Sequence, residues 1–224
     1  MDLVYICRDG DNEELRYSIR SAIENIPHEN IWVFGGKPDW YIGNHVRLKQ
    51  NGFKYDNARA NLAAVARHYD VSENFILMND DFYAIRPVES VLPLHRGTLQ
   101  EHLDMIKVNL GYKKFVQETQ DLLVSMGVTE PLSYELHVPM VMTKAGLKKV
   151  IRMDGLWRSL YGNLYSVGGE KFNDVKVHNT IDIDTLMKNP LPYISSHEDT
   201  FQGILDGYFK DAFPNPSKYE KSPQ

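Results

Sequence analysis

The residues best suited to chemistry stand where a short apolar segment stops abruptly. Residues 75–78 have the pattern of a buried strand, and Asn79-Asp80-Asp81 follows directly. In an open parallel sheet, ligands bind beyond the carboxyl ends of the strands, which is where these two acids would lie. Adjacent carboxylates repel each other unless a cation or a donor group compensates them. A divalent metal, Mn²⁺ or Mg²⁺, that holds a diphosphate would do so, and a solvated acidic turn or helix cap is the alternative.

Two further patterns lie at the end of the first expected strand and on the helix after it. In the turn Arg8-Asp9-Gly10-Asp11, Gly10 would let a ligand approach the backbone, and Asp9 could accept hydrogen bonds from a base or ribose. Arg16 and Arg20 are one helical turn apart, so they could grip phosphates through forked donors. An ordinary strand–helix turn and surface ion pairs with nearby glutamates explain the same residues equally well.

Two of the eight histidines occupy informative positions. His137 precedes Val138-Pro139 in an extended segment, and His197 stands in a short polar run at 195–199. Neither has the spacing of a zinc site, and a lone histidine is more often a structural donor or a surface residue. The chain also lacks a Gly-x-Gly-x-x-Gly run, a phosphate-loop lysine and a Gly-x-Ser-x-Gly elbow. Dinucleotide oxidoreductases, loop-type NTPases and α/β-hydrolases therefore lose support.

Composition predicts a globular protein with one main domain. The 224 residues are 42% hydrophobic and 25% charged, with a net charge of −5 that gives no footprint for nonspecific nucleic-acid binding. The single cysteine, Cys7, lies in an apolar run and is expected to be a small buried hydrophobe. No signal peptide or membrane span is visible, so we expect a cytoplasmic protein (host cytoplasm if phage-encoded). Residues 1–213 are expected to form the domain and 214–224 a C-terminal tail.

The elements that must position these residues follow an alternating order. Strands are expected at 3–7, 31–34 and 75–78, an extended segment at 136–142, and helices from about 13 to Pro27, at 57–68, at 98–126 with a break near Gly111, and at 143–153. A strand–helix–strand unit favours a parallel sheet. The prediction is a single-domain α/β fold with a mainly parallel, mixed sheet flanked by helices, and the C-terminal third is turn-rich.

Several of these segments, in the same order, resemble the Stealth family, whose members transfer hexose 1-phosphates from nucleotide sugars. Val4 to Gly10 looks like the family's Val-Tyr-Thr-Trp-Val-Asp-Gly, and residues 14–21 are close to its Glu-Leu-Arg-Tyr-Ser-Leu-Arg-Ser. Residues 31–40 follow its strand and Pro-x-Trp turn, 75–82 resemble its Phe-Ile-Tyr-x-Asn-Asp-Asp-Phe, and 137–139 fit its His-x-Pro. The chain departs from the family in lacking the long insertion between the Asp-Gly loop and the Arg-Tyr-Ser helix.

The resemblance implies a GT-A-like nucleotide-sugar transferase and gives several residues a role in binding or catalysis. The nucleotide would lie across Asp9, Gly10, Arg16 and Arg20, and Asp80 with Asp81 would face the diphosphate and a Mn²⁺ or Mg²⁺ ion. His137 would serve the acceptor, Arg158 would stabilise phosphate charge, and His197 would approach the metal. Asp81 or His137 would be the base in sugar transfer, whereas Arg158 with Arg16 would matter more if sugar 1-phosphate were transferred.

Three functions remain open at this point. The first is transfer of a sugar or sugar 1-phosphate to a hydroxyl acceptor such as a glycan. The second keeps this chemistry with a hydroxylated DNA base as acceptor, and would need a basic groove, for which Lys107, Lys113, Lys114, Lys144, Lys148 and Lys149 are available. The third is a noncatalytic nucleotide- or sugar-binding protein.

Overall fold

The computed structural model describes residues 1–177, 186–188 and 190–221. Its strands are β1 (Asp2–Cys7), β2 (Ile31–Gly35), β3 (Asn44–Arg47), β4 (Asn74–Asn79), β5 (Phe82–Ala84), β6 (Leu94–His95), β7 (Met140–Thr143), β8 (Glu170–Lys171) and β9 (Tyr193–Ser195). Its helices are α1 (Glu13–Asn25), α2 (Lys54–Val65), α3 (Leu99–Met105), α4 (Leu110–Ser125), α5 (Lys144–Val150), α6 (Trp157–Leu164), α8 (Glu198–Thr200), the π-helical turn η1 (Phe201–Leu205) and α9 (Asp206–Ala212).

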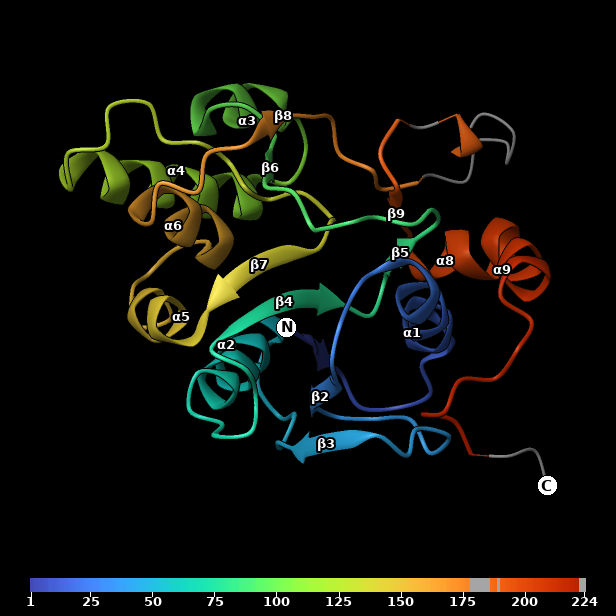
Figure 1. The fold of residues 1–224 in the computed structure, drawn as a ribbon. Helices are drawn as coiled ribbons and strands as arrows, with labels where there is room; N and C mark the ends of the chain where they lie inside the picture. The colour runs from blue at the N-terminus through green and yellow to red at the C-terminus, as the bar shows by residue number, and fades with distance from the viewer. Residues whose placement is uncertain (178–185, 189, 222–224) are drawn as a thin grey trace.

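The central element is a five-stranded sheet in the order β3-β2-β1-β4-β7. The pairs β3–β2, β2–β1 and β1–β4 are parallel, and β7 runs antiparallel to β4 at one edge. Figure 1 shows α1 on one side of this sheet and α2 on the other, with α3, α4 and α6 gathered beyond the β7 edge. This arrangement confirms the expected mainly parallel, mixed sheet flanked by helices. Two small sheets, β5–β9 and β6–β8, lie outside it.

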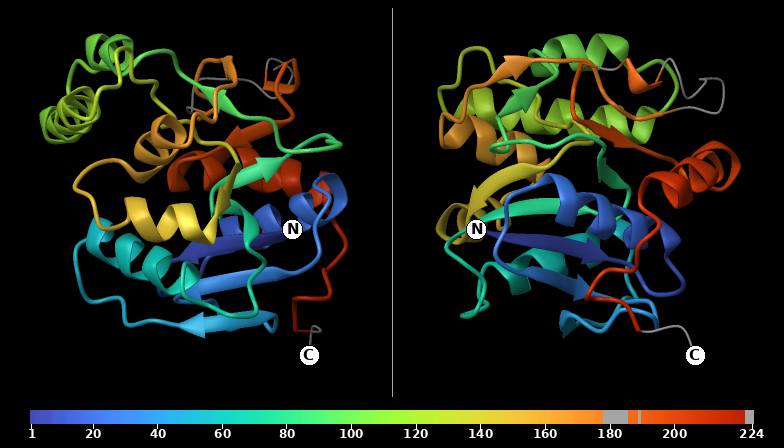
Figure 2. Two further views of the ribbon diagram at one scale, coloured as in Figure 1. Left: turned by 60° about the vertical axis from the view of Figure 1, so that its left-hand side comes forward. Right: turned by 45° about the vertical axis from the view of Figure 1, so that its right-hand side comes forward.

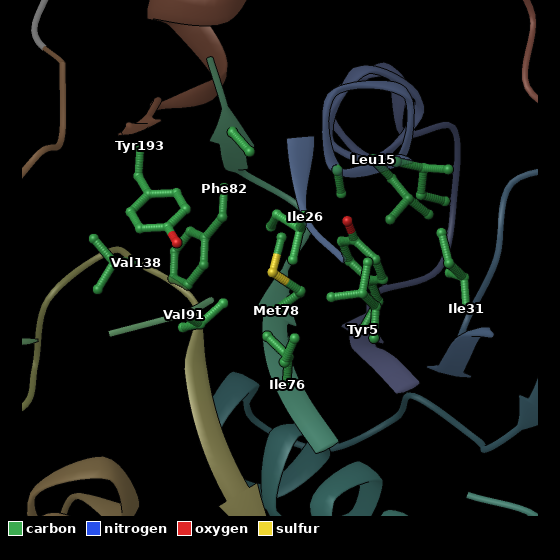
Figure 3. Close-up of a cluster of buried hydrophobic side chains, with 14 of the residues drawn as sticks. Tyr5, Leu15, Ile26, Ile31, Ile76, Met78, Phe82, Val91, Val138 and Tyr193 are labelled. Carbon is green, nitrogen blue, oxygen red and sulfur yellow. The ribbon is translucent and has the colours of Figure 1, made fainter. Parts of the chain in front are cut away.

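Alternating side chains of the strands build the core on both faces of the sheet. Leu3 and Tyr5 of β1 pack with Leu15 and Ile19 of α1, and the intervening Val4 packs with the α2 side. Figure 3 shows the α1-side cluster, which continues through Met78 of β4 to Phe82, Val138 and Tyr193. Because period-two alternation puts neighbours on opposite faces, apolar runs without polar gaps are what a sheet covered on both sides requires.

Helix α1 begins and ends as its sequence predicts. The side chain of Asn12 accepts a hydrogen bond of 2.9 Å from the backbone N–H of Leu15, which satisfies one of the free N–H groups at the helix start. Glu13 and Glu14 occupy the first turn, where the helix dipole favours acids. The helix ends before Pro27. The same cap fixes the turn between β1 and α1, on which the site described below depends.

The structure corrects several expected element boundaries. The helix expected at 57–68 is α2, which begins three residues earlier, and the expected 98–126 helix is two helices separated at 106–109, just before Gly111. Only the second half of the expected extended segment 136–142 belongs to a strand, β7. The short strands β3 and β5 were not predicted, because four and three residues carry too little periodicity.

The expected C-terminal tail is, in its described part, packed against the domain. Tyr219 stacks on Tyr41 with ring centroids 6.2 Å apart, and its carbonyl accepts a 2.9 Å hydrogen bond from the N–H of Ile42. Figure 1 shows this segment, in red, descending beside α1, and Figure 2 shows the same red segment in two further views. Composition suggested a tail because three prolines punctuate the segment, but its aromatic ring is buried. Across the described residues, no helix has the length and apolarity to cross a membrane.

Candidate active site

A cavity of about 440 Å³ opens where β1 and β4 end. We call it the edge cavity. Its charged and titratable lining residues come from seven separate stretches of the chain: Cys7, Arg8, Glu14, Lys54, Asp80, Asp81, His137, Lys176, His197 and Glu198. Strands β1 and β4 are parallel neighbours, so residues 7–8 and 79–81 reach the same edge of the sheet. The sequence predicted this location for the two aspartates.

Asp80 is held by the cap residue of α1. Its Oδ2 accepts a 2.6 Å hydrogen bond from Nδ2 of Asn12, whose Oδ1 caps the helix. Burial, together with the negative charge of Asp81, raises the pKa of Asp80 to about 6 despite that hydrogen bond. A positive charge that enters the cavity would therefore stabilise the ionised form of Asp80.

Asp81 is paired with a lysine that the sequence did not single out. Its Oδ2 lies 2.8 Å from Nζ of Lys176 and accepts a 3.1 Å hydrogen bond from Oγ of Ser195. Both side chains of the ion pair are more than four-fifths buried. The antiparallel register of β5 and β9 sets Ser195 opposite Phe82, and so brings the following residues, 196–198, to the cavity wall.

Glu14 is a third carboxyl group on this wall. Its Oε1 accepts a 2.8 Å hydrogen bond from Oγ of Ser196, which is also 3.0 Å from the hydroxyl of Tyr83. Burial and the charges of Asp80 and Asp81 raise the pKa of Glu14 to about 7. In the sequence, Glu14 opens the segment 14–21 that resembles the Stealth family, and it was not assigned a role in the site.

The donor set has the composition of a magnesium or manganese site that is shared with a substrate. Such ions commonly use one or two carboxylates together with substrate phosphates, and Asp80 and Asp81 supply two, one of them with a raised pKa. The expected third ligand, His197, lines the same cavity. Within the described ranges, however, no three His, Cys, Asp or Glu side chains come close enough together to hold a metal ion. The structure therefore does not assemble the predicted trio, because Asp81 faces Lys176 and Asp80 faces Asn12.

His137 lies on the boundary between the edge cavity and a larger one. It lines both, and the larger cavity measures about 940 Å³. Its Nδ1 is 2.8 Å and 3.0 Å from the two carboxylate oxygens of Asp174, and its backbone N–H donates to the same carboxylate at 3.1 Å. Burial alone would raise the pKa of Asp174, but the bonds from His137 and the charge of Arg96 lower it to about 2. Asp174 is therefore a permanent anion behind the imidazole.

Arg158 lies in the larger cavity rather than the edge cavity. Its Nε donates to the carbonyl of Tyr134 at 3.0 Å and its Nη2 to that of Val138 at 2.6 Å. The guanidinium also sits over the ring of Phe82, 5.9 Å from its centroid. Burial lowers the pKa of Arg158. These contacts fix the loop that carries His137, so the expected phosphate role of Arg158 finds no counterpart in this geometry.

The expected nucleotide-binding residues are placed differently from the prediction. Arg16 and Arg20 do not reach the edge cavity, because both pair with the buried Glu220, at 2.8 Å and 2.6 Å. Asp9 follows β1 and is bound by Arg47 at the end of β3, at the same edge of the sheet but outside the cavity lining. Gly10 adopts a φ of 101°, which explains a glycine in this turn without a ligand.

Comparison with known proteins supports the fold. No protein-family model matches the chain, and no curated protein matches it in sequence. Among solved structures, the galactosyltransferase LgtC in complex with donor and acceptor sugar analogues has a TM-score of 0.51 and 12% identity, over 100% of this chain and 98% of LgtC. An active-site mutant of LgtC gives 0.54 and 10% over the same shares. The glycosyltransferase GlyE of Streptococcus pneumoniae TIGR4 gives 0.41 and 11%, over 94% of this chain and 59% of GlyE.

This chain has the fold of LgtC. The likeness covers nearly the whole length of both chains and shows a GT-A-like α/β fold. At these identities the comparison concerns the fold alone. Membership of the Stealth family stays a prediction from the motifs, because no family model matches.

Proposed function

We propose that this protein is a nucleotide-sugar-dependent glycosyltransferase that moves a sugar to a hydroxyl acceptor. The observation that carries the proposal is the pair Asp80 and Asp81 in a polar cavity at the carboxyl edge of a sheet whose fold is shared with LgtC. The cavity lining carries four carboxyl groups, those of Glu14, Asp80, Asp81 and Glu198, against three cationic groups, those of Arg8, Lys54 and Lys176. Unless an incoming group supplies positive charge, this excess of acid is costly.

A divalent cation that binds together with the donor's diphosphate best accounts for this arrangement. A Mn²⁺ or Mg²⁺ ion bound with the donor by Asp80 and Asp81 would neutralise the charge that develops on the leaving nucleoside diphosphate. Lys176, which forms an ion pair with Asp81, would contribute an ammonium group to the same neutralisation. Arg8, on the cavity wall and half-exposed in an ion pair with Glu198, is available for phosphate oxygens.

Transfer of the sugar itself is favoured over transfer of a sugar 1-phosphate. Attack at phosphorus would need arginines around the phosphate, but Arg16 and Arg20 are bound to Glu220, and Arg158 donates to backbone carbonyls. Attack at the anomeric carbon needs a base near the acceptor, and His137 supports that role because it lines both cavities.

The larger cavity supports a glycan as acceptor better than a DNA base. Its aromatic wall offers flat apolar faces of the kind on which sugar rings stack: Tyr55, Tyr112, Phe115 and Trp157. Its charged lining is balanced, with Lys54, Arg59, Arg96 and Arg158 against Asp56, Glu118, Glu135 and Asp154. A groove for a nucleic-acid backbone would carry an excess of positive charge.

Donor binding tests the proposal directly. A thermal-shift series with UDP-, GDP-, dTDP- and CMP-sugars, with and without Mn²⁺ or Mg²⁺, should give a metal-dependent rise in Tm for one nucleotide class. Asp80→Asn and Asp81→Asn should lose that rise and donor turnover, whereas Asp211→Asn, an exposed control on α9, should keep both. No shift with any nucleotide sugar in folded protein would overturn the proposal.

A further inference from the structure

His137 and Asp174 form a polar pair that the proposed function does not yet explain in full. Three contacts of 2.8 to 3.1 Å join them, two through Nδ1 and one through the backbone N–H of His137. The pair is reinforced from behind by Arg96, whose Nη1 lies 3.4 Å from Asp174 and also donates to the carbonyl of Glu135. The carboxylate, and with it the ring plane of the histidine, is therefore fixed.

This pairing decides which ring nitrogen can act as a base. Asp174, with its pKa lowered to about 2, is ionised and can only accept hydrogen bonds. The hydrogen of the neutral imidazole must then reside on Nδ1, which leaves the lone pair on Nε2. Among the described residues, no hydrogen bond to Nε2 occurs. The side chain is 34% exposed and lines both cavities.

A second histidine shows what a purely structural role looks like in the same chain. His102 is 2% exposed, its Nδ1 lies 2.8 Å from Oγ of Ser133, and burial lowers its pKa to about 4. Among the described residues, no carboxylate is hydrogen-bonded to His102, and it lines neither cavity. His137 differs on each point, since it is accessible, faces an anion and stands where two cavities meet.

The geometry points to a His137–Asp174 dyad that removes the proton from an acceptor hydroxyl presented from the larger cavity, an inference that rests on the proposed function. Nε2 takes the hydroxyl proton while the acceptor oxygen bonds to the anomeric carbon. The bond from that carbon to the nucleoside diphosphate breaks, and its electron pair leaves with the diphosphate. Asp174 stabilises the imidazolium that forms and holds the productive tautomer. Asp174 is thus a positioning residue that acts through His137.

The surroundings of the ring are consistent with this division of labour. Phe82 presents its ring edge-on to His137 with centroids 6.1 Å apart, which limits the rotation of the imidazole. The charged groups around the dyad are Asp174 and Arg96 behind it, Arg158 of α6, which donates to the carbonyl of Val138, and Asp81 with Lys176 in the lining of the edge cavity. The acids and the lysine of the edge cavity lie on the donor side, and so the base stands apart from the diphosphate.

Water can stand in for the unidentified acceptor in the test. Release of nucleoside diphosphate from the nucleotide sugar that raises Tm, without acceptor, measures the same deprotonation. We expect His137→Ala to lower this rate by 10²-fold or more, the low end of the range for general-base catalysis. Added imidazole should restore part of the loss in His137→Ala. Asp174→Asn should slow release at least 10-fold, with the donor-induced Tm shift unchanged in both variants.

The double variant separates a positioning role from a structural one. If Asp174 acts only through His137, adding Asp174→Asn to His137→Ala should cause little further loss. His28→Gln, a histidine between α1 and β2 that lines neither cavity, is the matched control and should leave the rate unchanged. Full activity of His137→Ala, no imidazole rescue, or additive losses in the double variant would overturn the dyad. If the parent protein binds no nucleotide sugar, the proposed function itself is refuted.

Discussion

Nζ of Lys176 lies 2.8 Å from Oδ2 of Asp81, an ion pair between the segment before the C-terminal helices and the carboxyl end of β4. A metal ion that bound this carboxylate oxygen of Asp81 would compete with the ammonium group of Lys176. The lysine therefore stabilises the acidic cavity before any donor arrives.

Replacing this lysine should make the protein depend more on divalent cations. In Lys176→Met, Asp81 loses its ion-pair partner, so Tm should fall and added Mg²⁺ or Mn²⁺ should raise it more than in the parent protein. Differential scanning fluorimetry with a metal titration measures both effects. Lys210→Met, whose partner Asp206 is on the surface of α9, is the control. Equal metal responses in Lys176→Met and the parent would contradict this account.

Glu14 should weaken the fold at neutral pH and above. Its folded pKa of about 7 is higher than its ordinary value of 4.5, so the folded state binds the proton more tightly. Its contribution to stability is present in acid and is lost as pH rises from about 4.5 through 7. The Glu14→Gln variant keeps an acceptor for Ser196, and its free energy of unfolding at pH 8 should exceed that of the parent protein by about 1–3 kcal/mol. Urea unfolding at pH 8 and pH 4 tests this, since the gain should vanish at pH 4.

Glu220 should be essential for the packing of the C-terminal segment. It accepts two hydrogen bonds from Arg20 and one from Arg16, and these lower its pKa to about 2 although burial alone would raise it. Glu220→Ala removes the carboxylate that pairs with the nearly buried Arg20 and one of the two that pair with Arg16, and it should cost about 3–5 kcal/mol of unfolding free energy. Glu13→Ala, which removes a largely exposed partner of Arg16, should cost under about 1 kcal/mol. If denaturant unfolding shows that Glu220→Ala and Glu13→Ala lose similar amounts of unfolding free energy, this prediction is wrong.

Cys7 should be unreactive in the folded protein. It is 2% exposed, and burial followed by the charge of Asp80 raises the pKa of its thiol to about 12. Iodoacetamide at pH 8 should label it only in denaturant, because the thiolate is the reacting form. Rapid labelling of native protein, followed by intact mass, would show that the edge cavity exposes the thiol. The expected role as a buried small residue is confirmed by its position in the core.

The unit formed by β1, α1 and β2 could be predicted because its signals are local. An apolar run, a capping asparagine and a helical repeat lie within 35 residues and define β1, α1 and β2. Strand β9 gave no such signal. Its three residues are specified by pairing with β5, more than a hundred positions away, and no local period records that pairing.

The candidate site divides in the same way. Asp80, Asp81, His137 and His197 were named from the sequence, and all four line the edge cavity. Glu14, Lys176 and Asp174 were missed, since each acquires its significance from a partner far along the chain. Arg16 and Arg20 were misassigned for the same reason. Their spacing fits a phosphate, but the group they hold is Glu220, 204 and 200 residues away.

The pairing of β5 with β9 has a consequence for the order of events during synthesis. Residues 195–198 complete the wall around Asp81, and Glu220 secures α1. A ribosome-bound chain that has released only its first 170 residues can form the β1–α1–β2 unit but has neither Lys176 nor Ser196. In such a nascent chain Asp81 lacks its ion-pair partner, so the wall around this aspartate can close only after the last part of the chain has been made.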